Sequence, residues 1–564
     1  MATTGWKIAF LACLLGATSS FLLPWSDSEL AVPPSATIPE GSLGTTEDSS
    51  NGQPADPEPE LAGPPGPNEA VADEEARGSS HRLRNQLDRI LPDHRFPGSD
   101  WALVAVSLAK GDTLYSRNAD LPLAPASNAK LLTSAAALHY LGPDFRFPTF
   151  LLADGPVEDG VLRGDLILYG TGDPTISDRF HPSRTRVFEE LAAALQARGV
   201  HRIEGRVIGD GSFFSQTGVP ESWDPANFSN SYSAPASALA FNENVVTLRV
   251  APGGGPGEPA RIRTLPEGAK VDVHNEASTV TGRAWPPLSV ERRSFDEPIR
   301  VSGQLSPGAQ ESWRVIPVGE PALYTASVFR NVLLQAGIVV DGQAQGIQDA
   351  HTSRVTNGSG TIRAPRFQDH SSGPELLAIH RSPPLQDLLE VVNKRSNNFY
   401  SEVILLALGR LVRDHGSFDG GTAALRGFLA GRVGLDTSRM HIYDGSGLSR
   451  ENRITARDLV ALLSYMAESP LEEAFWQTLP EAGSPRELNR MHRTAAAGNL
   501  RAKTGTIRNV SALSGIVHSV DGEPILFSII GNGVSSPWAF KRVEDQIGEE
   551  LARFYRPAPE IVTE

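Results

Sequence analysis

The sequence predicts an α+β protein in which two distant parts of the chain build one antiparallel sheet around a large β-rich insertion. Strand-like runs on either side of the turns Lys110-Gly111-Asp112 and Asp521-Gly522 are typical of β-hairpins, one near each end of the globular region. Helical stretches accompany both hairpins, whereas from about residue 145 the chain consists mainly of short β-like pieces between Gly, Pro and Asp turns. We therefore expect flanking helices, a helical subdomain and an insertion.

The composition limits the kind of protein this can be. The chain has 564 residues, of which 40% are hydrophobic and 21% charged, enough for a large core and typically two to four domains. A single cysteine, Cys13, excludes an intramolecular disulfide and a cysteine-rich metal cage, and the 13 histidines show no His-Glu-x-x-His pattern. We expect no metal and no cofactor. The net charge of −15 argues against a nucleic-acid partner.

The N-terminal region reads as a leader followed by a tether. Residues 1–23 contain Lys7, an apolar run and small residues, a pattern typical of a signal peptide, with a signal anchor as the alternative. Residues 24–80 are rich in Pro, Gly, Ser and acids, and we expect them to be disordered. The protein is therefore expected to be exported to the periplasm or cell envelope, and to meet a membrane only if the leader stays uncleaved. Its oligomeric state is left open.

The globular part is then expected to divide into two halves of one domain around the insertion. The first half spans residues 81–145, the inserted β-rich domains (two of them) residues 146–370, the second half residues 371–557, and a short tail residues 558–564. The pattern predicts helices at 82–91, 127–140, 186–198, 385–393, 399–411 and 455–464, and strands at 101–109, 113–117, 510–520 and 525–530. A closing amphipathic helix carries Phe540, Val543, Ile547, Leu551 and Phe554 on one face.

Ser-x-x-Lys occurs twice, and the predicted elements distinguish the two copies. Ser107 and Lys110 fall where a strand enters a turn, so this copy reads as a coincidence. Ser127 and Lys130 fall at the start of a helix, where residues three apart share a face. A serine hydroxyl becomes a nucleophile when a nearby base removes its proton, and a partly desolvated lysine amine can do so. Taken alone, this pair is more often an ordinary helix start.

Two further short motifs carry polar groups in suggestive places. Ser396-Asn397-Asn398 lies in the break between two helices, where a plain turn and N-cap is the usual reading. Lys503-Thr504-Gly505-Thr506 precedes the strand at 510, on an edge where a lysine and two hydroxyls can hold a carboxylate. By contrast, Asp444-Gly445-Ser446-Gly447 does not match the Gly-x-Ser-x-Gly hydrolase elbow and reads as a turn.

Together and in this order, Ser-x-x-Lys, Ser-x-Asn and Lys-Thr-Gly resemble the penicillin-recognising serine acyltransferases. The first two motifs are 269 residues apart, and such an insertion is similar to that of D-alanyl-D-alanine carboxypeptidase/endopeptidases of the penicillin-binding protein 4 type (low-molecular-mass class C). The resemblance covers about residues 82–556 and also rests on the segments 168–174, 232–235, 393–398, 444–450 and 502–506. It implies a penicillin-binding transpeptidase/β-lactamase-like fold.

The resemblance also implies a role for each motif residue. Ser127 would attack the bond between two D-alanines in peptidoglycan stem peptides, with Lys130 as general base, and the same serine would be acylated by β-lactams. Ser396 and Asn398 would relay a proton to the leaving D-alanine and hold the substrate amide, supported by Lys503. The side chains of Thr504 and Thr506, on either side of Gly505, would bind the terminal carboxylate, and the backbone N–H groups of Ser127 and Thr506 would form the oxyanion hole.

One segment departs from the family pattern. Family members often carry Trp-x-Trp-x-Asp, whose acid is thought to receive the amino end of a diaminopimelyl side chain. Here the stretch is Trp223-Asp224-Pro225-Ala226-Asn227, so that Asn227 takes the place of the acid and Asp224 is a candidate substitute. A neutral Asn gives a weaker contact with an ammonium group. The third residue of the stem peptide is therefore left open.

Two other functions remain as alternatives at this level. A non-catalytic peptidoglycan-binding protein could use the same groove, although a retired enzyme would be free to lose its reactive residues. A β-lactamase or esterase on the same fold would need rapid deacylation, and the sequence shows no obvious extra acid for that step. The expected function is an exported serine-type carboxypeptidase with endopeptidase activity, in a ratio that the sequence does not give.

Overall fold

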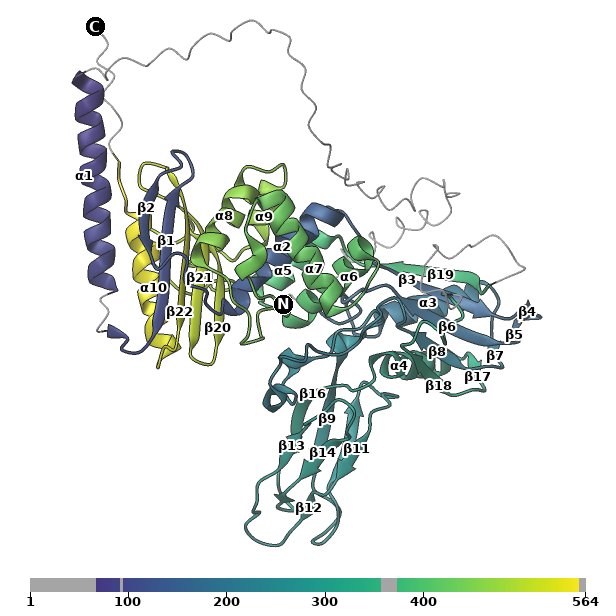
Figure 1. The fold of residues 1–564 in the computed structure, drawn as a ribbon. Coiled ribbons are helices and arrows are strands. Elements are labelled where there is room, and N and C mark those ends of the chain that lie inside the picture. The colour runs from purple at the N-terminus through teal and green to yellow at the C-terminus, as the bar shows by residue number, and fades with distance from the viewer. Residues whose placement is uncertain (1–66, 92–94, 357–372, 557–564) are drawn as a thin grey trace, which may run out of the picture. The chain divides into compact units, whose positions relative to one another are not determined.

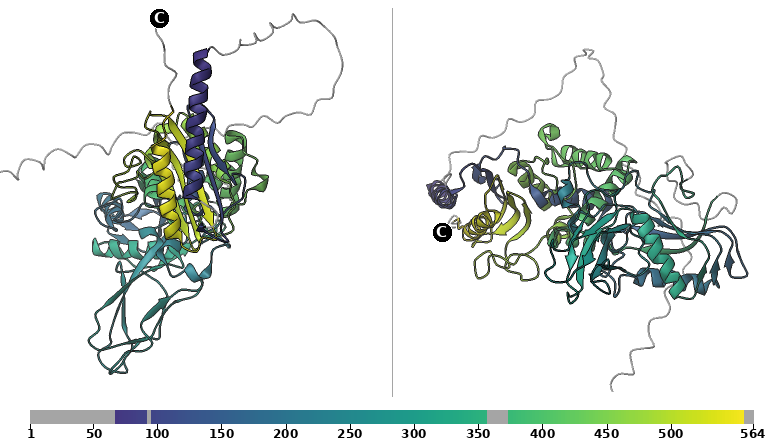
Figure 2. Two further views of the ribbon diagram at one scale, coloured as in Figure 1. Left: turned by 90° about the vertical axis from the view of Figure 1, so that its left-hand side faces the viewer. Right: turned by 90° about the horizontal axis from the view of Figure 1, so that it is seen from below.

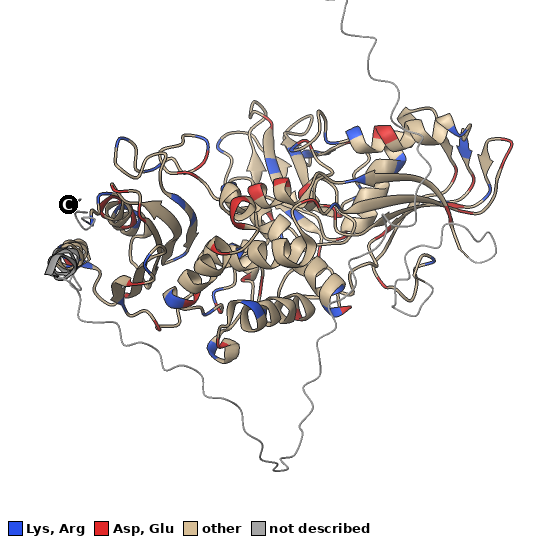
Figure 3. Cartoon of the chain, turned by 90° about the horizontal axis from the view of Figure 1, so that it is seen from above, with Lys and Arg blue, Asp and Glu red and all other residues tan. Residues whose placement is uncertain are grey.

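The structure, a computed structural model, describes residues 67–91, 95–356 and 373–556, and the side chains of that part from residue 78 onward. The leader, residues 24–66 of the expected tether and the whole tail lie outside the described residues. Among the helices that are described, none combines the length and the hydropathy needed to cross a bilayer. Acidic and basic segments are interspersed along the ribbon in the view of Figure 3.

One antiparallel sheet joins the two ends of the globular chain, which confirms the predicted fold class (Figure 1). Its strands, in the spatial order β2-β1-β22-β21-β20, are β2 (Thr113–Arg117), β1 (Asp100–Ser107), β22 (Pro524–Asn532), β21 (Val510–His518) and β20 (Arg501–Ile507). The two ends meet where β1 pairs with β22 from Asp100↔Asn532 to Ser107↔Ile525. Strand β20 is therefore an edge of this sheet.

Alternating side chains of this sheet enter two different hydrophobic cores. On β21, Ala512 and Ile516 belong to the core shared with the central helices, whereas Leu513 and Val517 belong to the core under α10 (Pro537–Ala552). This is the period of two that a sheet buried on both faces requires. Helix α1 (Pro67–Ile90) packs beside α10, as two views show (Figures 1 and 2). The face predicted for α10 is buried as expected.

Helices crowd the opposite face of the sheet and hold the segment from which the first motif comes. They are α2 (Lys130–Leu141), α5 (Leu385–Lys394), α6 (Asn398–Arg413), α7 (Phe418–Phe428), α8 (Ala456–Ala467) and α9 (Glu472–Thr478). Thr455 caps α8 as predicted, with its hydroxyl accepting from the N–H of Asp458. Helix α6 is buried along its first three turns, because it packs against both α2 and α7. Helices α7 and α9 were not predicted.

The inserted region contains its own sheets. A five-stranded sheet has the order β18 (Ala344–Ile347), β8 (Val207–Asp210), β6 (Asp165–Gly170), β3 (Pro148–Asp154) and β19 (Glu375–Arg381). A four-stranded one has the order β17 (Val339–Val340), β7 (Arg202–Ile203), β5 (Val161–Leu162) and β4 (Val157–Glu158). The helices α3 (Arg186–Ala197) and α4 (Pro321–Gln335) contribute to the same hydrophobic core.

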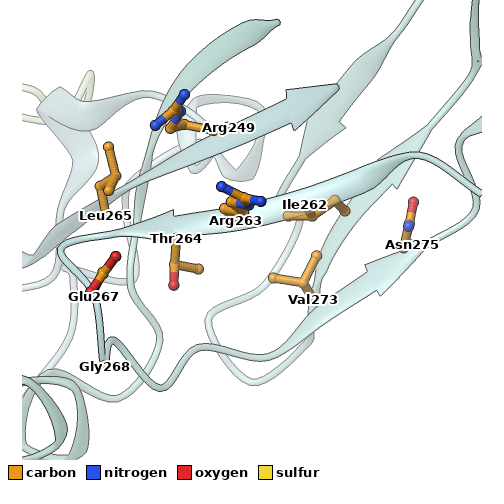
Figure 4. A pocket seen from close by; sticks show the side chains of 9 residues that line it. All are labelled: Arg249, Ile262, Arg263, Thr264, Leu265, Glu267, Gly268, Val273 and Asn275. Atoms are coloured by element: carbon orange, nitrogen blue, oxygen red, sulfur yellow. The ribbon is translucent and has the colours of Figure 1, made fainter. Parts of the chain in front are cut away.

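The remaining strands of the insertion form three small sheets. They are β10 (Arg261–Leu265), β9 (Val245–Ala251) and β16 (Ser312–Pro317); β11 (Val273–Asn275), β14 (Ile299–Ser302) and β13 (Ser289–Glu291); and β12 (Ser278–Thr279) with β15 (Gln304–Leu305). A hollow of about 590 Å³ opens on β9, β10 and β11, lined among others by Arg249, Arg263 and Asn275 (Figure 4). It contains none of the predicted site residues.

Three expected boundaries are wrong. Helix α1 begins at Pro67, so the disordered tether cannot extend to residue 80. Residues 67–80 are too polar to build a core, but they are rich in Ala and Glu, which favour a helix. The insertion extends past residue 370, because β19 pairs with β3 up to Arg381↔Pro148. The helix predicted from residue 127 begins as a 3₁₀ turn, η2 (Ala126–Ala129), and becomes α-helical only at Lys130.

Candidate active site

Ser127 and Lys130 meet at the junction of η2 and α2. In a 3₁₀ turn residues three apart are eclipsed, so the two side chains point the same way. The Nζ atom of Lys130 lies 3.0 Å from the Oγ atom of Ser127. The Ser127 side chain is half-buried, whereas Lys130 is fully buried. The η2 turn is attached to the central sheet, because the Asn128 side chain donates a hydrogen bond of 2.7 Å to the Ser514 hydroxyl on β21.

Lys130 is held by two further acceptors from other parts of the chain. Its Nζ atom donates to Oδ1 of Asn398 at 2.7 Å and to the carbonyl oxygen of Ser446 at 2.8 Å. Burial lowers the pKa of Lys130 to about 7, while the charges of Glu402 and Asp444 oppose that shift. The amine can therefore lose its proton near neutral pH and is aimed at the Ser127 hydroxyl.

The second motif enters the site at the start of α6. Asn397 caps this helix, with its side chain accepting from the N–H of Tyr400 at 3.1 Å. This cap, together with a left-handed backbone at Ser396 (φ 52°), turns Ser396 and Asn398 toward the first motif. Asn398 also donates a 3.0 Å hydrogen bond to the carbonyl of Tyr232, from the inserted region. The break between the two helices therefore combines an N-cap at Asn397 with a left-handed residue at Ser396, and it directs two side chains into the site.

The third motif brings a second buried lysine to the same place. Lys503 on β20 donates to Oγ of Ser396 at 3.0 Å and to the carbonyl oxygen of Thr504 at 2.8 Å. Burial keeps the pKa of Lys503 well below its ordinary value, and the charge of Lys130 acts in the same direction. Hydrogen bonds therefore join Ser127, Lys130 and Asn398, and a second bonded pair, Lys503 and Ser396, is brought to the same place by the 396–398 loop.

The free edge of β20 faces this network. A two-residue loop joins β20 to β21 at the pair Ile507↔Val510, so Ile507, Gly505 and Lys503 bond to β21 and the N–H groups of Thr504 and Thr506 point to the open edge. Gly505 allows β20 to lie against η2, because a Cβ atom there would come within 2.8 Å of the carbonyl oxygen of Pro125. Thr506 is exposed and Thr504 is half-buried.

Sequence reasoning missed the residues that hold this network from behind. Asp444 is fully buried and accepts from the backbone N–H of Gly447 and from the indole of Trp223, the latter at 2.9 Å. Glu402, one turn after Asn398 on α6, accepts from two backbone N–H groups of the 444–447 loop. The i, i+4 spacing of Asn398 and Glu402 was the available signal. The 444–447 loop is a turn, as predicted, but its Ser446 carbonyl is part of the site.

Asp224 and Asn227 lie on a 3₁₀ turn, η3 (Pro225–Asn227), in the inserted region. Asp224 is exposed and caps that turn, accepting from the N–H of Ala226 at 3.0 Å. Asn227 accepts a 3.0 Å hydrogen bond from the hydroxyl of Tyr232, whose carbonyl oxygen is bonded to Asn398. Asn227 is therefore connected to the site through one residue, whereas the Asp224 carboxylate is engaged by its own backbone turn.

Two other places near the predicted motifs do not join the network. The Oγ atom of Ser107 accepts a local hydrogen bond of 3.2 Å from the backbone N–H of Lys110, so the first Ser-x-x-Lys copy is part of a turn. A hollow of about 620 Å³ adjoins the Ser396 loop and is lined by residues that include Lys394 and Arg395. Lys394 is paired there with Glu390 at 3.0 Å and with Glu487 at 3.4 Å.

Comparison with known proteins places this architecture in one family. D-alanyl-D-alanine carboxypeptidase from an Actinomadura species is 34% identical over 485 residues, which cover 84% of this chain and 85% of that protein. D-alanyl-D-alanine carboxypeptidase DacB from Haemophilus influenzae is 26% identical over 457 residues, covering 80% and 88%. The crystal structure of penicillin binding protein 4 from H. influenzae shares the fold, with a TM-score of 0.67 and 24% identity over 83% of this chain and 98% of that one.

A sequence profile of one peptidase family matches residues 83–554, which include all three motifs and the whole insertion. The chain belongs to the D-Ala-D-Ala carboxypeptidase 3 (S13) family.

Proposed function

We propose that this protein is an exported serine-type D-Ala-D-Ala carboxypeptidase that also cleaves cross-linked stem peptides, and that β-lactams acylate it at Ser127. The observation that carries the proposal is the 3.0 Å approach of a fully buried lysine amine to the Ser127 hydroxyl, inside a network of three motifs. The family and the carboxypeptidase names of its relatives support the reaction class. A structure of the H. influenzae protein in complex with a β-lactam supports the inhibitor class.

The first step is acylation of Ser127. Neutral Lys130 takes the hydroxyl proton, and Oγ attacks the carbonyl between the two D-alanines. The negative charge that develops on the carbonyl oxygen is stabilised by the backbone N–H groups of Ser127 and Thr506. Such donors are worth about 3–4 kcal/mol each in comparable enzymes, so the spacing between η2 and β20 matters as much as the nucleophile.

The second motif and strand β20 protonate and bind the leaving D-alanine. Ser396, bonded to Lys503, passes a proton to the departing D-alanine nitrogen, and Asn398 holds the substrate amide. The hydroxyls of Thr504 and Thr506 bind the terminal carboxylate, on the strand that carries Lys503. Water then hydrolyses the acyl-enzyme. No cofactor enters any of these steps.

The cellular site of this reaction follows from the substrate and the leader. Peptidoglycan stem peptides lie outside the cytoplasm, and residues 1–23 have the charge and hydropathy pattern of an export signal. We therefore place the enzyme in the periplasm or cell envelope. Expression of the full chain with a C-terminal reporter, followed by fractionation and mass spectrometry of its N-terminus, tests both export and cleavage.

A fluorescent penicillin tests the chemistry directly. Wild-type protein should be labelled covalently, and Ser127→Ala should not be labelled, because it lacks the attacking oxygen. Ser107→Ala is the matched control: it removes the serine of the other Ser-x-x-Lys copy, which bonds only to its own turn, and it should be labelled like the wild type. Equal labelling of wild type and Ser127→Ala would refute the proposal.

Turnover separates an enzyme from a protein that only binds stem peptides. A diacyl-D-Ala-D-Ala tripeptide should release free D-alanine with the wild type and not with Ser127→Ala. Digestion of purified muropeptides, followed by mass spectrometry, should show loss of terminal D-alanine from monomers and conversion of dimers to monomers. Binding of the tripeptide without any release of D-alanine would instead favour a wall-binding protein.

A further inference from the structure

A buried carboxylate behind the site has no part in the reaction as described so far. Glu402 on α6 is 1% exposed. Its two carboxylate oxygens accept hydrogen bonds from the backbone N–H groups of Gly445, at 2.9 Å, and Ser446, at 2.8 Å. Burying an ionisable group at this depth is costly unless its hydrogen bonds and neighbouring charges compensate it, so its presence calls for a reason.

The two N–H groups belong to the loop that supports Lys130. The carbonyl oxygen of Ser446 accepts from Nζ of Lys130 at 2.8 Å. The preceding carbonyl, that of Gly445, accepts from the hydroxyls of Thr133 at 2.8 Å and Ser401 at 2.7 Å. The loop is therefore held by Glu402 and Ser401 of α6 and by Thr133 of α2, and these bonds direct the Ser446 carbonyl at the lysine.

Three charged side chains face Lys130 from the elements around it. They are Glu402 on α6, Asp444 in the loop and Lys503 on β20. The two carboxylates favour the protonated amine, whereas burial and the second lysine favour the neutral one. In turn, burial and the charge of Asp444 raise the pKa of Glu402, and Lys130 acts against that shift. Lys130 and Glu402 therefore titrate as a coupled pair in the same pH range.

We infer that Glu402 is a positioning residue for the general base: its carboxylate holds the backbone of Gly445 and Ser446 so that the Ser446 carbonyl meets the Lys130 amine, and it places a buried carboxylate near that amine. This inference rests on the proposed function, because it concerns the base of that reaction. It adds an acid outside the three motifs to the acylation machinery. It also explains the i, i+4 spacing of Asn398 and Glu402. On one face of α6, Asn398 accepts a hydrogen bond from Lys130, and Glu402 holds the Ser446 backbone that also binds Lys130.

The pH dependence of acylation tests the inference. The rate constant of acylation by a chromogenic penicillin is measured from pH 5 to 9 for the wild type and for Glu402→Gln. Removing the negative charge lowers the pKa of Lys130, so the acidic limb of the profile should move to lower pH by about one unit. The plateau should fall at least ten-fold, because a glutamine amide offers one acceptor oxygen to two N–H donors.

Glu544→Gln is the matched control. Glu544 is also a fully buried glutamate, but on α10, where it accepts from Ser511 at 2.6 Å and from Arg490 at 2.8 Å. Its loss should lower thermal stability and leave the acidic limb unmoved. The inference would be overturned if the acidic limb of the pH–rate profile of Glu402→Gln coincided with that of the wild type, whatever the maximal rate. Glu402 would then be a structural residue. A wild type that is not acylated at all would instead refute the proposed function.

A second measurement decides the case if Glu402→Gln does not fold. Coupling between two titrating groups is reciprocal, so Lys130 must shift the pKa of Glu402 as much as Glu402 shifts that of Lys130. The carboxyl ¹³C signal of Glu402 is titrated in wild-type protein and in Lys130→Ala. The Glu402 midpoint should rise by about one unit when the amine is removed. An unchanged midpoint would overturn the inference without any reference to catalysis.

Discussion

Gly505→Ala perturbs the candidate site at its narrowest point without touching a reactive group. An alanine Cβ at position 505 would come to 2.8 Å from the carbonyl oxygen of Pro125, 3.1 Å from Cβ of Ala126 and 3.2 Å from the backbone nitrogen of Ser127. Ordinary contacts begin at 3.4 Å, so η2 and β20 must separate by about 0.6 Å. Both elements carry one of the two proposed oxyanion donors.

The expected effect on rate is therefore larger than the effect on stability. A misplacement of 1 Å can cost about 100-fold in rate, so a separation of this size should slow acylation roughly 10- to 100-fold. Inserting one methyl group into a well-packed contact costs about 1–3 kcal/mol of stability. Backbone strain does not contribute, since Gly505 is not among the residues with a left-handed backbone.

Acylation by a fluorescent penicillin, followed by stopped flow, and chemical denaturation measure the two effects separately. Gly308→Ala is the control, because no atom lies within 4 Å of its added Cβ and its backbone is not left-handed, so both rate and stability should be unchanged. If Gly505→Ala acylates at the wild-type rate, then the spacing of η2 and β20 does not limit the reaction, and the assignment of the oxyanion donors is wrong.

Four further expectations follow from the contacts of the site. Wild-type acylation should increase as the pH rises through about 7, because deprotonation of Lys130 generates the base, and Lys130→Ala should lose orders of magnitude in acylation rate while circular dichroism stays unchanged. Glu243→Gln should lower the acylation rate several-fold with little change in melting temperature, because Asn397, which caps α6, donates a 3.0 Å hydrogen bond to the Glu243 carboxylate. Trp223→Phe should cost about 1.5–3 kcal/mol in chemical denaturation, because it removes a hydrogen bond to buried Asp444.

Local patterns predicted several elements. Four strands of the central sheet follow from apolar runs beside turn residues, the N-cap at Thr455 follows from its residue type, and the buried face of α10 follows from helical spacing. Predictions failed where the deciding partner lies far away in sequence. Strand β19 forms because it pairs with β3, which lies more than two hundred residues earlier in the chain. No pattern within residues 375–381 predicts that pairing.

By itself, the sequence determined the chemistry of the site: a serine with a lysine three residues later, a Ser-x-Asn loop and a lysine on an edge strand, in a fixed order. The tertiary structure decided how these groups act on one another, because a pKa depends on burial and on charges that no local pattern contains. Lys130 becomes a base through its depth in the protein and through Asn398 and Ser446, which approach it from hundreds of residues away. Asp444 comes close to Lys130 only when the chain folds, and the one local signal for Glu402 is its i, i+4 spacing from Asn398, so the three motifs did not reveal either residue.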